Sequence, residues 1–118
     1  MSWVGKWKNQ NGSILEITSD TRGMIAGTYH TKVGKGGTKA TVRGIHSGDM
    51  IAFTVSWAPD SESITAWTGL RRGKSLHTVW HLVSGTTWDA KENGAPAIRR
   101  NVEPWEAFNT NADLFKLV

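Results

Sequence analysis

Hydrophobic and polar residues alternate along most of this 118-residue chain, in short runs separated by clusters of turn-forming residues. A period of two is typical of β-strands, because successive side chains point to opposite faces of a sheet. Clusters such as 9–12 (NQNG) and 71–74 (RRGK) tolerate tight hairpin geometry. The pattern predicts strands at hairpin spacing over residues 3–9, 13–19, 24–31, 39–46, 50–58, 62–71, 75–84 and 109–117.

The connections between these runs indicate how the strands are arranged. Most are short turns, and the glycine-rich stretch 32–38 joins the third and fourth strands. Segment 85–106, with Pro96 and Pro104, is longer than connections in compact domains usually are, and we interpret it as an irregular lid or insertion. We therefore expect an all-β fold, an eight-stranded antiparallel up-and-down β-barrel, forming a single domain over residues 1–118.

The predicted inner face of the barrel combines large aromatic side chains with polar ones. It includes Asn9, Ser13, Tyr29, Thr31, Trp57, Ser63, Thr65, Trp67, Trp80 and Asp113. A plain core would consist of Val, Ile and Leu, because a buried polar group without a partner costs about 1–3 kcal/mol. A single inward Thr or Trp is more often an ordinary core residue, so only the whole set predicts a cavity for a small polar ligand.

Charge and composition exclude several classes of partner. The formal net charge is +4, but the cations of 71–74 and of Arg99 and Arg100 are scattered and form no stripe with aromatic residues, which argues against nucleic acid. No stretch approaches the roughly 20 apolar residues of a membrane span. The chain has no cysteine and residues 1–3 show no secretory leader. Localisation therefore stays open at this point.

Catalysis and metal binding find little support in the residue pattern. Carboxylates lie mostly in turns, without the spacing of a catalytic acid–base pair. His77 and His81 would stand roughly 13 Å apart on one strand and point outward, too far apart to share an ion. Two other binding functions remain as alternatives. A lipocalin-like carrier needs a mainly apolar cavity, whereas a carbohydrate-binding β-barrel module would stack sugars on exposed aromatic rings.

Blocks of sequence along nearly the whole chain resemble the avidin/streptavidin family. The matching blocks are 5–13 (GKWKNQNGS), 27–31 (GTYHT), 53–57 (FTVSW), 63–69 (SITAWTG), 78–82 (TVWHL) and 111–115 (NADLF). Each block is weak alone, but together they repeat the family's order and spacing. The resemblance implies non-catalytic, high-affinity binding of biotin inside the barrel, with biotin as ligand and no cofactor.

The resemblance also implies a role for each polar residue of the inner face. Asn9, Ser13 and Tyr29 would donate hydrogen bonds to the ureido carbonyl oxygen of biotin. Thr31 and Asp113 would accept from its two N–H groups, and the charge of Asp113 would strengthen its bond.

The same resemblance assigns the remaining contacts to the sulfur, the hydrocarbon and the tail of biotin. Thr65 would meet the thioether, and Ser63 and the backbone near Gly34 and Lys35 would meet the valeryl carboxylate. The walls would be Trp57, Trp67, Trp80, Val33 and Leu82. Asn11 and Lys35 replace residue types that the family often carries, which affects the expected contacts of the pocket and tail.

Trp105 lies eight residues before Asp113, like a family tryptophan that reaches a neighbouring subunit. The resemblance therefore implies a homo-oligomer, a tetramer in preference to a dimer, with Trp105 in the biotin site. It also favours secretion. Trp88, within the long segment, receives no role.

Overall fold

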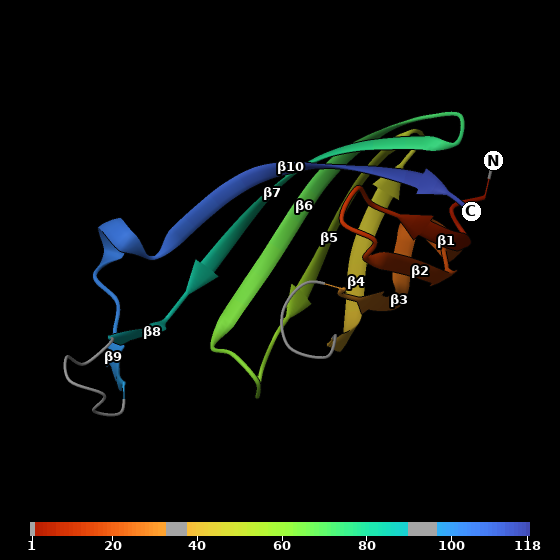
Figure 1. Cartoon of the computed structure of the whole chain (residues 1–118). Coiled ribbons are helices and arrows are strands. Elements are labelled where there is room, and N and C mark those ends of the chain that lie inside the picture. Colours follow the sequence, from red (N-terminus) through yellow and green to blue (C-terminus); the bar gives the residue numbers. More distant parts are fainter. Residues whose placement is uncertain (1, 33–37, 90–96) are drawn as a thin grey trace.

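The computed structural model describes residues 2–32, 38–89 and 97–118, and its main body is a closed antiparallel β-barrel (Figure 1). The barrel strands are β1 (Gly5–Lys8), β2 (Ile14–Ser19), β3 (Met24–His30), β4 (Lys39–Ser47), β5 (Met50–Ser56), β6 (Ser63–Arg72), β7 (Ser75–Ser84) and β10 (Phe108–Leu117). Their order around the barrel is β1-β10-β7-β6-β5-β4-β3-β2, so β10 closes the ring against β1. The eight-stranded up-and-down barrel predicted from the alternation is confirmed.

Burial follows the period of two that the sequence shows. On β6, Ser63 and Thr65 are buried while Ile64 and Ala66 face solvent. The same alternation on β10 buries Asp113 among exposed neighbours. Inner-face residues from every barrel strand therefore meet in one interior, and its composition changes from one end of the barrel to the other.

One end of the barrel is filled by an aromatic and cationic plug. Trp7 donates its indole N–H to the carbonyl of Trp3 (3.2 Å), and the Arg71 guanidinium lies 4.7 Å from the ring of Trp7 and 5.1 Å from that of Trp3. Arg71 also donates to the carbonyls of Ser2 (2.6 Å) and Gly73 (2.8 Å). Its hydrogen bonds explain why Arg71, placed by the sequence among scattered cations beside a hairpin turn, is only 4% exposed. We call this region the plugged end.

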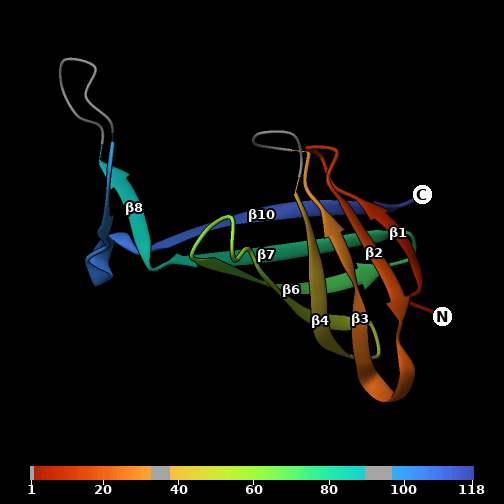
Figure 2. The same ribbon diagram turned by 90° about the horizontal axis from the view of Figure 1, so that it is seen from below.

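The described parts of segment 85–106 are not irregular, so that part of the interpretation is wrong. Strands β8 (Thr86–Asp89) and β9 (Ile98–Asn101) pair as a separate two-stranded sheet, which we call the arm. Figures 1 and 2 show that the arm stands away from the barrel, beyond the shared ends of β7 and β10. The sequence contains the signal for such a pairing, because Asn93-Gly94, a favoured hairpin dipeptide, lies midway between the two runs.

Polar contacts hold the base of the arm to the barrel. Gly85 donates its backbone N–H to the carbonyl of Glu62 (2.9 Å), and the Glu62 carboxylate pairs with Arg99 of β9. Arg100 pairs with Glu106 in the turn η3 (Pro104–Glu106), and this bond holds the pKa of Glu106 below its usual value. The arm is therefore braced through β9 and through Gly85, just before β8.

The helical turns η1 (Thr21–Gly23) and η3 have three residues each. Within the described ranges, no helix has the length and apolar character that crossing a bilayer requires.

Candidate functional site

The end of the barrel opposite the plug surrounds a cavity of about 150 Å3, and we call it the open end. The β1–β2 hairpin, the end of β3 and the beginning of β6 all reach this rim, which brings together residues far apart in the sequence. Ten of the residues that the resemblance implied line the cavity: Asn9, Asn11, Ser13, Tyr29, Thr31, Trp57, Thr65, Trp67, Trp80 and Asp113.

Asn9 organises the hairpin that carries the first part of the site. Its side-chain oxygen accepts hydrogen bonds from the backbone N–H groups of Asn11 (3.0 Å) and Ser13 (2.9 Å). Its side-chain nitrogen donates to the hydroxyl of Tyr29 (3.3 Å). The family resemblance implied only a donor role for Asn9 toward the ligand, whereas its oxygen also shapes the turn that presents Ser13.

Tyr29 is a buried phenol at the centre of the cavity wall, 4% exposed. Burial, together with the negative charge of Asp113, raises the pKa of Tyr29 to about 12, and a hydrogen bond with Ser13 acts in the opposite direction. Because its oxygen accepts from Asn9, its own proton remains available for donation into the cavity. Tyr29 therefore stays a hydrogen-bond donor well above neutral pH.

Asp113 is the buried acceptor of the site. One carboxylate oxygen accepts from the indole N–H of Trp67 (3.2 Å) and the other from the side-chain amide of Gln10 (2.7 Å). The sequence pattern did not point to Gln10. This residue lies in a turn between two predicted strands, where the alternation of inward and outward side chains does not apply. Each carboxylate oxygen carries two lone pairs, so Asp113 keeps acceptor capacity beyond these two bonds.

The aromatic wall of the cavity is linked to its polar groups. Trp57 donates its indole N–H to the hydroxyl of Thr65 (2.8 Å), which fixes the ring and leaves the hydroxyl proton of Thr65 for another acceptor. The ring of Tyr29 packs edge-on against Trp57 at 5.8 Å and tilted against Trp67 at 5.1 Å. Such packing restricts these side chains before any ligand arrives.

The other predicted site residues lie outside the cavity lining or outside the described ranges. Ser63 is buried and its hydroxyl bonds to that of Ser61 (2.9 Å), while Leu82 is half-buried on β7. Trp105, on η3, is 82% exposed and does not line the cavity of its own chain. Val33 and Lys35, with the Gly34 backbone, lie outside the described residues.

The open-end cavity brings donors and acceptors from different strands into one small space. Asn9, Ser13 and Tyr29 come from the β1–β2 hairpin and β3, whereas Asp113 comes from β10. This arrangement suits a planar polar group that accepts and donates at once, as a cyclic urea does. In the part of the chain that the structure describes, no three His, Cys, Asp or Glu side chains are placed to hold a metal ion.

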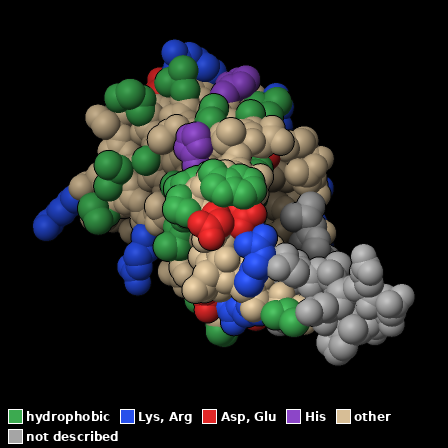
Figure 3. All heavy atoms as spheres, turned by 90° about the vertical axis from the view of Figure 1, so that its left-hand side faces the viewer, with side chains coloured by type: hydrophobic (Ala, Val, Ile, Leu, Met, Phe, Trp, Pro, Cys, Tyr) green, Lys and Arg blue, Asp and Glu red, His purple; other side chains and the backbone are tan. Residues whose placement is uncertain are grey.

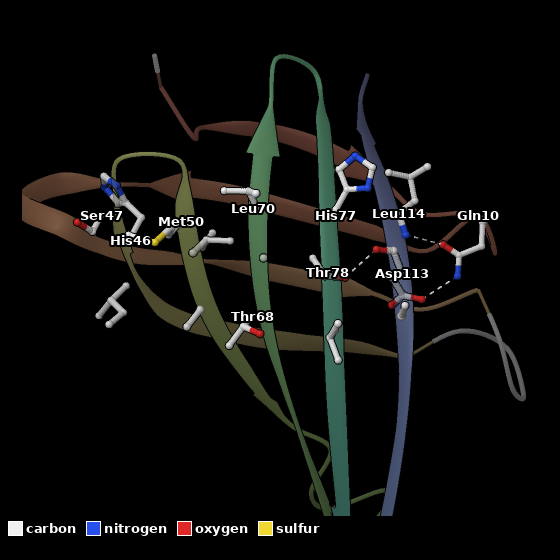
Figure 4. A pocket seen from close by; sticks show the side chains of 16 residues that line it. Gln10, His46, Ser47, Met50, Thr68, Leu70, His77, Thr78, Asp113 and Leu114 are labelled. Carbon is white, nitrogen blue, oxygen red and sulfur yellow. Dashed lines mark hydrogen bonds between the residues drawn. The ribbon is translucent and has the colours of Figure 1, made fainter.

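A larger hollow of about 1030 Å3 lies on the outside of the barrel, over β4, β5, β6, β7 and β10 (Figure 4). We call it the outer groove. Its exposed apolar lining residues include Ile45, Met50, Leu70, Val79 and Leu114, and His77 and Gln10 also contribute. Asp113 lines both the outer groove and the cavity, so this residue lies in the wall between them.

Comparison with known proteins identifies the family. The avidin family profile matches residues 1–117. The chain belongs to the avidin family. The predicted resemblance to this family is confirmed. Avidin-family proteins are non-enzymatic, with biotin as a ligand and no cofactor.

Similar avidin-family proteins include a vertebrate and a bacterial relative. Over 96 residues, 70% of this chain, it is 40% identical to Avidin-related protein 4/5 of Gallus gallus. Over 86 residues, 64% of this chain, it is 29% identical to Afifavidin of Afifella pfennigii. The chain spans less than two thirds of these relatives, 63% and 54% of their lengths. The bradavidin2–biotin complex has a similar structure, with a TM-score of 0.73 at 27% identity, covering 100% of this chain and 99% of that one.

Proposed function

We propose that this avidin-family protein binds biotin non-covalently in the open-end cavity, without catalysing a reaction on it. The observation that carries the proposal is the convergence of Asn9, Ser13, Tyr29 and Asp113 on one cavity. Three donors directed at one carbonyl oxygen stabilise negative charge there, much as an oxyanion hole does. The bradavidin2–biotin complex supports biotin as the ligand of this barrel.

The proposed pose follows from the donors and acceptors of the cavity. The ureido oxygen of biotin accepts from Asn9, Ser13 and Tyr29, and one ureido N–H donates to the Asp113 carboxylate while the other donates to Thr31. The thioether accepts from Thr65, whose proton the Trp57 contact leaves available. Trp57, Trp67 and Trp80 cover the rings of biotin, and Asn11 contributes at the hairpin edge.

The valeryl tail of biotin leaves through the open end in this proposal. Leu82 contacts the hydrocarbon of the tail. Ser63, buried at the start of β6, binds the tail carboxylate with the hydroxyl that bonds to Ser61 in the ligand-free chain. Val33 and Lys35 keep the roles that the resemblance implied, as further contacts to the tail.

A carbohydrate-binding module is the alternative that the sequence left open. Sugar stacking requires aromatic faces that solvent reaches, whereas Trp67 is buried and Trp57 and Trp80 are half-buried in the cavity wall. This arrangement favours a ligand enclosed by the barrel over a sugar stacked on its surface.

Isothermal titration calorimetry with free biotin tests the proposal. At micromolar protein we expect stoichiometric heat with one ligand per chain, and a melting temperature that rises with biotin excess because biotin binds only the folded barrel. Soluble mono- and disaccharides serve as the comparison. No heat and no thermal shift with biotin would refute the proposal, and a shift with a sugar alone would favour the alternative.

We further propose that the chain assembles as a homo-oligomer, a tetramer in preference to a dimer, with a second copy of the chain over the outer groove. Five neighbouring strands present exposed apolar side chains there, including Ile45, Met50, Leu70 and Val79. Continuous apolar surface of this kind is unusual on a monomer, and a two-fold axis would let one such face cover its equivalent.

Trp105 supplies a second apolar surface for the assembly. It is 82% exposed, and Phe108 at the start of β10 is 66% exposed. Figure 3, which looks from the side of the arm, shows hydrophobic side chains exposed beside acidic and basic ones. We propose that Trp105 contacts the biotin site of a neighbouring subunit.

Light scattering of the wild type, Leu70→Lys and Trp105→Ala, each with and without biotin, tests the assembly. We expect Leu70→Lys to reduce the mass, and Trp105→Ala to weaken biotin and subunit association together. A monomeric wild type that still loses affinity on Trp105→Ala would refute the cross-subunit contact.

A further inference from the structure

Gln10 joins the β1–β2 hairpin to β10 at a place where the barrel ladder is incomplete. Strands β1 and β10 pair only at Trp7 with Leu117 and at Lys8 with Lys116. Beyond these pairs the side chain of Gln10 takes the place of a strand: its oxygen accepts from the backbone N–H of Leu114 (3.0 Å), and its nitrogen donates to the Asp113 carboxylate (2.7 Å; Figure 4). One amide therefore satisfies a backbone donor and a buried charge together.

The two donors to Asp113 restrain its carboxylate from different directions. Gln10 donates to one oxygen and the Trp67 indole to the other, at 2.7 Å and 3.2 Å. A carboxylate bonded at both oxygens cannot rotate without losing one of these bonds. An acceptor that is already oriented loses little freedom when a ligand N–H arrives, which strengthens binding.

Gln10 also reaches the Asp113 carboxylate from the side of the outer groove. Gln10 and Asp113 both line that groove, while Asp113 alone of the two lines the cavity (Figure 4). Removing the side chain of Gln10 would take the donor away from one carboxylate oxygen and let a water molecule bind in its place. Water there would compete with a ligand N–H for the same oxygen atoms.

We infer that Gln10 is a positioning residue for biotin binding, which acts through Asp113 by orienting its carboxylate. The inference rests on the proposed function for its effect on biotin. The effect of Gln10 on the Asp113 carboxylate is also present in the ligand-free protein. The effect on Asp113 and the effect on biotin binding can therefore be tested separately.

The ligand-free test uses the indole N–H of Trp67, which bonds to Asp113. Hydrogen exchange of this proton, followed by NMR, should be faster in Gln10→Ala than in the wild type, because the freed carboxylate leaves the indole more often. Lys8→Ala, an exposed change on neighbouring β1, is the matched control and should leave the exchange rate unchanged. Equal exchange in Gln10→Ala and the wild type would overturn the inference, whether or not biotin binds.

The ligand-bound test is a double-mutant cycle on biotin dissociation. We expect Gln10→Ala to speed dissociation about 5- to 20-fold, less than the loss of a direct bond to a charged group, because Gln10 acts on the ligand only through Asp113. In the Asp113→Ala background the same change should have no further effect, because the group through which Gln10 acts is gone. Gln10→Glu keeps the acceptor for Leu114 but loses the donor, so it should be at least as harmful as Gln10→Ala.

The cycle separates a positioning role from a merely structural one. The inference would be overturned if the effects of Gln10→Ala and Asp113→Ala on dissociation were fully additive, or if Gln10→Glu dissociated at the wild-type rate. Gln10 would then serve only as the acceptor for the backbone N–H of Leu114. A wild type that fails to bind biotin would refute the proposed function, and the Trp67 exchange result would still decide the placement of Asp113.

Discussion

The two ends of this barrel are built from similar residue types but put them to different uses. At the plugged end, Trp3 and Trp7 enclose the guanidinium of Arg71, whose bonds go to carbonyl groups of the chain itself. At the open end, the indole of Trp67 bonds to the carboxylate of Asp113, but acceptor capacity remains and a cavity of about 150 Å3 lies beside it. A buried charge fully bonded within the chain favours stability, whereas one left with spare acceptor capacity favours a ligand.

The largest expected effect belongs to the plugged end. Trp7→Ala removes a fully buried ring together with its contact to Arg71, so the free energy of unfolding should fall by about 3–5 kcal/mol. Urea denaturation of the ligand-free protein measures this loss, with Lys8→Ala as the exposed control. Biotin affinity of the folded fraction should stay near the wild-type value, because Trp7 does not line the cavity. A loss of biotin affinity in Trp7→Ala would contradict the conclusion that the plugged end serves stability and the open end serves ligand binding.

The next effect concerns Tyr29 at alkaline pH. Its pKa is raised to about 12 in the folded chain, above the ordinary value of 10.0, so the folded state keeps a proton that the unfolded state releases. Stability should therefore be unaffected by Tyr29 below pH 10 and fall by up to about 1.4 kcal/mol per pH unit between pH 10 and 12. Tyr29 is the chain's one tyrosine, so phenolate absorbance reports it alone.

The matched variant for this titration is Asp113→Asn. Removing the negative charge beside Tyr29 should bring the absorbance midpoint closer to 10 while leaving the phenol buried. A midpoint near 10 in the folded wild type would contradict the burial of a protonated phenol at the open end.

A smaller effect is expected from deleting polar groups of the cavity. Asp113→Ala and Asn9→Ala should each weaken biotin by about 1–3 kcal/mol, with the larger loss at Asp113 because its bond is charge-assisted. Dissociation kinetics measure both. Asn9→Ala should also destabilise the hairpin, since the Asn9 oxygen accepts from Asn11 and Ser13. Wild-type dissociation in both variants would show that the cavity residues are wrongly assigned.

The smallest effect belongs to the arm, which lies outside both ends. Arg99→Ala breaks an ion pair with Glu62 whose side chains are 45% and 56% exposed. Solvent-exposed pairs contribute little, so unfolding in urea should change by less than about 1 kcal/mol. Cavity binding should not change at all, and a clear loss of biotin affinity would make the arm part of the open end.

Alternation of residues was enough to predict the barrel and most of the cavity. Side chains of Tyr29, Trp67 and Asp113 share the inner face because a strand repeats every two residues, and this period is visible without a structure. The same period of two places Arg71 on the inner face of β6 together with Trp67. Its burial could therefore have been predicted, but its charge argued against an inward position. Gln10 was not readable, because it lies in a turn and its partner Asp113 is 103 residues away. The strands of the arm were missed for another reason, since Asn93-Gly94 was not used as a hairpin signal.

The distribution of tryptophans between the two ends has an optical consequence. Trp57, Trp67 and Trp80 line the cavity, so a ligand that fills it changes the polarity around their indoles and should alter their emission. Trp3 and Trp7 are sealed against Arg71, and their emission should stay constant as the cavity fills. Trp105, exposed on η3, instead reports contact with solvent or with another chain. The protein thus carries an internal fluorescence reference, an occupancy signal and an assembly signal in one type of side chain.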